Sequence, residues 1–146
     1  MFEKRPSEEW IAAVRQSAKD KTNRRFLNDS IHYTKILAET MIRPATQSVD
    51  IYSGSLDRTC YEDAVVNVKC AVRILVDDLQ AANWAKAGDN VTIKKAPRDM
   101  GEHFFIADGA AFRFELDHNK AMAIANFNEP EVCAELKRRF DAAWNA

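Results

Sequence analysis

Residues 101–128 read GEHFFIADGAAFRFELDHNKAMAIANFN and carry the strand and turn pattern that decides the fold. The first apolar run in this stretch ends in Asp108-Gly109, a pair that favours a tight turn. The stretch closes with an Asn-Phe-Asn turn after a further run of small and apolar residues. We therefore expect two or three short strands between His103 and Ile124.

The rest of the chain alternates between helical and strand periodicity. We expect helices at about 7–19, 28–43, 57–66, 79–86 and 129–144, and strands at 49–53, 71–76 and 91–93. The nearly continuous apolar run at 71–76 is typical of a strand buried on both faces of a parallel sheet. This order predicts an α/β fold in which helices flank a mixed sheet. We divide it into an N-terminal helix and connector, 1–28, and an α/β domain, 29–146.

Composition limits the classes of function. The chain has 146 residues and a net charge of −1, which gives no global attraction to nucleic acid or anionic membranes, although local basic patches remain open. Its three cysteines are odd in number and lack metal-ligand spacing, so we expect reduced thiols, no bound metal and a cytoplasmic location. We expect no secretion signal, and no apolar run approaches the ~18 residues of a membrane span.

Residues 101–128 also resemble the signature segment of the phospholipase D superfamily. That motif is His-x-Lys, four residues, Asp, and then a small-residue turn ending in Asn-Phe. The resemblance implies that the histidine attacks a phosphodiester, while the lysine and the asparagine hold phosphate oxygens. Upstream, 49–56 and 71–78 resemble two core strands of the family, and 136–144 resembles its closing helix. The resemblance implies a phospholipase D-like half-domain.

The motif fits this sequence in two alignments, and neither is complete. The first is anchored on the apolar strand and its Asp-Gly turn, and places Gly101 at the nucleophile and His103 at the lysine. We prefer this alignment because it keeps the strand and both turns in the family's order, and in it the nucleophile is missing. The second is anchored on His118 and Lys120, a true His-x-Lys, but places Ala125 at the position of the Asp.

The first alignment gives three candidate ligand-binding residues: His103, Asp108 and Asn128. Each has an ordinary structural alternative. A histidine at a strand start makes a routine hydrogen bond, Asp-Gly forms turns, and an asparagine shortly before a proline caps a helix.

The second alignment gives three candidate catalytic residues: His118, Lys120 and Asn126. Residues two apart on a strand point to the same side, as a phosphate site requires. The structural alternatives are a polar hairpin turn at 117–120 and an asparagine used in a turn or cap.

Two basic clusters could contact phosphates, or could simply be solvated surface. They are Lys19, Lys21, Arg24 and Arg25, and Lys94, Lys95 and Arg98.

These patterns predict a catalytically inactive phospholipase D-like module that acts by binding a phosphate-containing ligand, a nucleic acid or a protein partner. The family's site needs two motif copies and this chain holds one, so the resemblance implies a C2 homodimer formed through the same sheet edge or cleft. The alternative is an active phosphodiesterase or nuclease, independent of metal and cofactor, that uses His118, Lys120 and Asn126.

Overall fold

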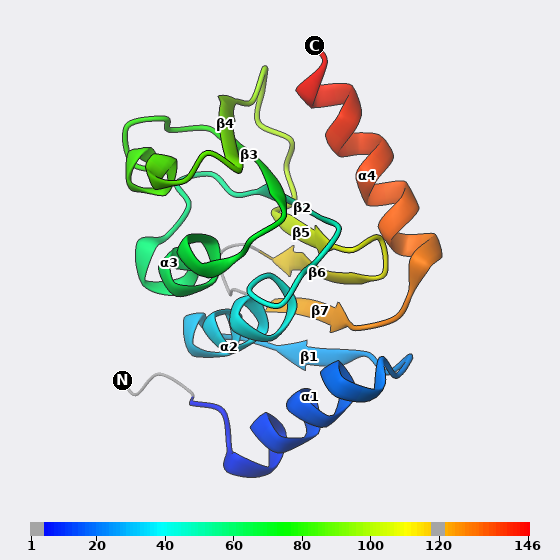
Figure 1. The fold of residues 1–146 in the computed structure, drawn as a ribbon. Helices are drawn as coiled ribbons and strands as arrows, with labels where there is room; N and C mark the ends of the chain where they lie inside the picture. The colour runs from blue at the N-terminus through cyan, green and yellow to red at the C-terminus, as the bar shows by residue number, and fades with distance from the viewer. Residues whose placement is uncertain (1–4, 118–121) are drawn as a thin grey trace.

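A computed structural model describes residues 5–117 and 122–146. Within these residues, seven strands form one sheet in the order β1-β7-β6-β5-β2-β3-β4 (Figure 1). The strands are β1 (Phe26–Asn28), β2 (Ser48–Tyr52), β3 (Ala71–Val76), β4 (Val91–Lys95), β5 (Phe104–Ala107), β6 (Ala111–Asp117) and β7 (Met122–Asn126). The helices are α1 (Glu8–Asp20), α2 (Ile31–Met41), α3 (Arg58–Asn67) and α4 (Pro130–Trp144), with a 3₁₀ helix η1 (Asn83–Ala87).

The sheet is mixed, and β2 lies where its two halves meet. β2, β3 and β4 run parallel, whereas β5 pairs antiparallel with β2 and leads into an antiparallel meander of β5, β6 and β7. β1 closes the far edge by pairing with β7. The carboxyl ends of β2 and β3 therefore lie at the same end of the sheet as the start of β5, and this arrangement positions the candidate site.

Helices cover both faces of the sheet. α1, α2 and α3 pack on one face around a large apolar cluster, whereas α4 packs alone on the other face around a smaller one (Figure 1). The smaller cluster joins Cys133, Leu136 and Phe140 of α4 to sheet residues that include Phe104 and Phe112. This three-layer arrangement confirms the α/β architecture expected from the sequence.

Local signals in the sequence placed most of the helix ends correctly. The Ser7 hydroxyl accepts a hydrogen bond from the Trp10 amide at the start of α1, and the Asp57 carboxylate caps α3 in the same way. α4 begins at Pro130, where a missing N–H costs nothing.

Two expectations were wrong. The helix expected at 79–86 is a turn followed by the short 3₁₀ helix η1. Residues 26–28, assigned to the N-terminal connector, form the edge strand β1 instead. Both segments are short, so tertiary packing decides their conformation more than local propensity does.

No helix in the described residues is both long and apolar enough to span a membrane.

Arg73 holds α4 against the parallel half of the sheet. Its guanidinium donates to both carboxylate oxygens of Asp50, at 2.7 and 3.0 Å, and to Asp141 of α4 at 2.7 Å. The same group lies over the rings of Phe140 and Trp144, 4.9 and 5.5 Å from their centroids. One side chain thus neutralises a buried carboxylate and fixes the last turns of α4.

We expect Arg73→Ala to lower the free energy of unfolding by about 3 kcal/mol, because it leaves the nearly buried Asp50 carboxylate without its partner. Urea denaturation followed by tryptophan fluorescence measures the loss. Lys137→Ala is the control, since it removes an exposed partner of Asp141 and should cost less than about 1 kcal/mol. Similar losses in the two variants would contradict the anchoring role of Arg73.

Candidate functional site

A cavity of about 550 Å³ opens where β2 and β3 end and β5 begins. The loop after β2 contributes Ser53, Gly54 and Ser55, and the loop after β3 contributes Asp77 and Asp78. Its other lining side chains come from α2, α3, β6 and the segment before β5: Ile31, Thr34, Asp57, Cys60, Tyr61, Asp99, His103, Arg113 and Glu115. Open α/β sheets bind ligands at this kind of edge, so the cavity is the first candidate site.

His103 lies in the wall of this cavity and its ring orientation is well defined. Its Nδ1 lies 3.7 Å from Oε1 of Glu115, and its ring packs edge-on against Tyr52 with the centroids 5.3 Å apart. The opposite edge of the ring faces the loop after β2, since a methyl group added to Gly54 would lie 3.4 Å from His103 Nε2 and from Asp77 Oδ2. A histidine held in this way resembles an acid–base group in geometry.

A buried polar chain supports His103 from behind. Arg113, only 2% exposed, lies within 3.3 Å of Glu115 through Nη1 and donates through Nε to Asn28 of β1 at 3.1 Å. Sequence reasoning missed Arg113 and Glu115, because alternating charges in a strand normally indicate a solvent face. The signal in the sequence was the small residues of β7, since Ala123 and Ala125 leave room for a long side chain to cross toward β1.

Carboxylates dominate the mouth of the cavity. The Tyr52 hydroxyl lies 3.1 Å from Asp77 and 3.3 Å from Asp99, and it accepts a hydrogen bond from the Met100 amide. Burial raises the pKa of Tyr52 to about 12, and the nearby carboxylates also raise it. The cavity lining within the described residues carries five carboxylates but a single guanidinium, Arg113, which is already paired.

Asp108 lies at the opposite end of β5 from His103, a separation of about 16 Å along the strand. Its carboxylate accepts hydrogen bonds from the backbone amides of Thr46, Gln47 and Ser48 at 2.7–3.2 Å. Asp108 and Gly109 both have positive φ, as a type I′ turn requires. In this structure Asp108 fastens the β5–β6 turn to the start of β2.

Asn126 is also remote from His103, because it pairs across the sheet with Phe112 near the β5–β6 turn. Its amide is completely buried, and it accepts from the Arg24 and Asn128 amides while donating to Asn23 and Glu129. Asn128 contributes its backbone amide to this network.

The structure therefore does not bring the candidate site residues into one group. His103 lines the cavity, while Asp108, Asn126 and Asn128 lie at the other end of the antiparallel half. His118 and Lys120 fall outside the described residues. Among those that are described, no three His, Cys, Asp or Glu side chains are arranged to hold a metal ion.

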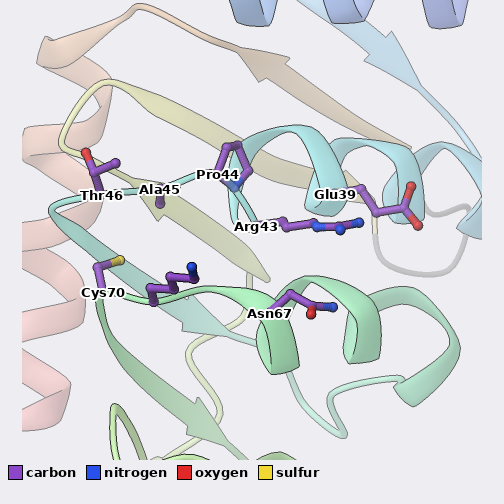
Figure 2. Close-up of a pocket in the computed structure, with 8 residues that line it drawn as sticks. Glu39, Arg43, Pro44, Ala45, Thr46, Asn67 and Cys70 are labelled. Atoms are coloured by element: carbon purple, nitrogen blue, oxygen red, sulfur yellow. The ribbon is translucent and has the colours of Figure 1, made fainter.

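A second hollow, of about 650 Å³, lies at the amino ends of β2 and β3 (Figure 2). The carboxyl ends of α2 and α3 form it, with Glu39 and Arg43 on one wall and Asn67 and Cys70 on another. The Arg43 guanidinium is paired with Asp63 at 3.0 Å, which leaves it less available to a ligand.

We expect Cys70 to react with iodoacetamide at pH 8 well before Cys60 and Cys133. All three thiols are free, but burial raises the pKa of Cys60 to about 11 and of Cys133 to about 12, whereas Cys70 is half-buried in the open hollow. Burial raises the pKa of Cys70 too, so its labelling should be slow rather than immediate. Mass spectrometry of labelled peptides checks the order. Labelling of Cys133 first in the folded protein would contradict the packing of α4.

No known family model matches this chain, and no curated protein sequence is similar to it. Solved structures do share its fold. One is TrmBL2, an archaeal chromatin protein described as showing a novel mode of DNA binding, with a TM-score of 0.65 and 17% sequence identity over 95% of this chain. This chain spans 58% of the length of TrmBL2.

Another is NucT from Helicobacter pylori, with a TM-score of 0.60 and 11% identity; the match covers 85% of this chain and 97% of NucT. At these identities the likeness establishes the fold, and the site has to be judged from its own residues.

Proposed function

We propose that this protein is a phospholipase D-like module that lacks phosphodiesterase activity and binds nucleic acid. The observation that carries the proposal is the charge of the cavity beside His103. A phosphodiester is an anion, and a site that cleaves it must stabilise further negative charge in the transition state. Here Asp77, Asp78 and Asp99 line the same cavity as His103, the one histidine of its described lining, and carry charge of the wrong sign.

The position of His103 also argues against the family's chemistry. In the preferred alignment it occupies the lysine position, while Gly101 replaces the nucleophile and is exposed with φ +86°. The paired Arg113 is too deeply buried to reach a substrate, at 2% exposure. Among the described lining residues, no lysine takes the place of Arg113 as a phosphate ligand.

Nucleic acid is the partner favoured by the fold. TrmBL2 shares the architecture over nearly all of this chain and is described as binding DNA. A fold can keep a binding role after its catalytic residues are replaced, because backbone contacts to phosphates depend on surface cations rather than on a nucleophile. We keep the cytoplasm as the proposed location, where three free cysteines would remain reduced.

We expect the purified protein to leave fluorescent single-stranded DNA, RNA and a small phosphodiester ester intact in EDTA, yet to bind a nucleic acid in a salt-sensitive manner. EDTA suppresses contaminating metal-dependent nucleases but not the metal-independent family mechanism. His103→Ala and His118→Ala are the matched variants, and both should match the wild type in binding.

Cleavage that survives EDTA and disappears in one of these variants would overturn the proposal. It would favour the active phosphodiesterase alternative and identify its nucleophile. Failure to bind any of the polymers would instead direct the search to a protein partner.

The homodimer expected from the single motif copy remains part of the proposal. α4 makes its main contacts with the sheet on β2, β5 and β6, and on the same face apolar side chains of β1 and β7 remain exposed. Leu27 and Met122 on that face are 69% and 40% exposed, and Leu27 lies opposite the half-buried Ile124. A groove of about 320 Å³ between the sheet and α4 is lined by Phe114, Val132 and Leu136, together with the charged side chains Glu131, Glu135 and Arg139.

This half-covered face suits a second copy of the chain. α4 projects from this face beside the exposed side chains of β1 and β7. Two molecules related by a two-fold axis would each place α4 over the exposed strands of the other. Such an isologous contact buries the same apolar side chains twice. The contact would lie at the β1 edge of the sheet.

We expect Leu27→Asp to shift the protein from dimer to monomer, because it introduces a charge at the centre of this face. Light scattering coupled to size exclusion measures the mass. Val66→Asp is the control, since Val66 is 56% exposed on α3, which packs on the opposite face. A dimer that survives Leu27→Asp, or a wild-type monomer at high concentration, would contradict this contact.

A further inference from the structure

One short segment of the chain is rich in positive charge. Residues 15–25 contain five Lys or Arg residues and one carboxylate, although the whole chain has 21 basic and 22 acidic residues. The rest of the protein is therefore acidic, and its cavity beside His103 is especially so. We call this segment the basic ridge; its cations are Arg15, Lys19, Lys21, Arg24 and Arg25, all exposed.

The first part of the ridge is the outer surface of α1. Val14 and Ser17 face the core, so Arg15 and Lys19 point away from it, one helical turn or about 6 Å apart. α1 then ends firmly at Lys21, which adopts the left-handed conformation and donates its amide to the Ser17 carbonyl. The Thr22 hydroxyl donates to the Ser17 hydroxyl at 2.7 Å, which fixes the turn into the connector.

Asn126 fixes the second part of the ridge. Its buried amide accepts from the Arg24 backbone at 3.1 Å and donates to Asn23 at 2.7 Å. Arg25 forms a bidentate pair with Glu129, and the Arg24 guanidinium lies 4.8 Å from the centroid of the Phe26 ring. The connector is thus ordered, and its cations need not lose much conformational freedom on binding a ligand.

Four cations of the ridge have no counter-charge within the part of the chain that the structure describes. Among residues 5–117 and 122–146, no carboxylate forms an ion pair with Arg15, Lys19, Lys21 or Arg24. The single acid of the segment, Asp20, accepts a hydrogen bond from Gln16 at 2.7 Å. Surface cations are usually interspersed with acids, so a run of unpaired ones marks a surface for a polyanion.

We propose that the basic ridge binds the phosphodiester backbone of nucleic acid, without reading its sequence. This inference rests on the proposed function and adds the surface that performs it. A membrane is disfavoured as the anionic partner, because Trp10 and Val14 of α1 pack into the core and leave no free apolar face to insert.

The test compares Arg15→Gln/Lys19→Gln with Lys69→Gln/Lys86→Gln. Both double variants remove two positive charges, and all four side chains are exposed, but Lys69 precedes β3 and Lys86 lies in η1, outside both basic clusters. Glutamine suits a helix well, so α1 should stay folded, and circular dichroism checks this. Binding to a 30-base-pair duplex and to one of its strands is measured by fluorescence anisotropy from 50 to 200 mM salt.

We expect the ridge variant to bind about tenfold more weakly and to lower the slope of log K against log salt by about 2, while the control behaves like the wild type. If the wild type binds and both variants weaken binding equally, or neither weakens it, the ridge is not the binding surface. The proposed nucleic-acid binding would then still stand. A wild type that binds neither DNA form at 50 mM salt would overturn the ridge together with the function.

Discussion

The antiparallel half of this fold is organised around one buried guanidinium. Arg113 lies in the core layer between the sheet and α2, where an unpaired charge would cost several kcal/mol. Glu115 and Asn28 satisfy it, and Glu115 in turn lies beside His103. One polar chain thus connects β1, β6 and the cavity histidine, and the small side chains of β7 leave room for it.

Charge is segregated over the molecule. The end of the sheet that holds His103 is acidic, whereas the N-terminal helix and its connector carry cations that no described carboxylate pairs with. The resemblance to the phospholipase D superfamily implies that Asn126 contacts a phosphate, whereas in the structure Asn126 holds the connector.

Local chemistry in the sequence predicted most of the elements. Ser7, Asp57 and Pro130 mark helix starts, and the apolar run at 71–76 forms the strand it indicates. The predictions that failed concern segments whose conformation depends on tertiary context. The three residues of β1 are too few to show a period, and the short helix-forming segment at 79–86 is overridden by the route it must take between β3 and β4.

The site was harder to predict than the fold for the same reason. Arg113 and Glu115 alternate with Phe and Leu and so suggest a solvent face, but α2 covers that face. The turn that Asp108 forms was visible in its Asp-Gly pair, because that signal is local. The distance between Asp108 and His103 was not visible in the sequence, since it depends on which end of a strand each residue occupies.

The two edges of the sheet have a consequence for how the protein behaves when concentrated. An exposed edge strand is a template on which another chain can add, and long flat edges lead to aggregation. Here β1 offers only three residues, and β4 carries Lys94 and Lys95 at its end. Neither edge suits open-ended strand addition, so self-association through main-chain pairing is blocked at both ends and contacts between molecules must use side chains.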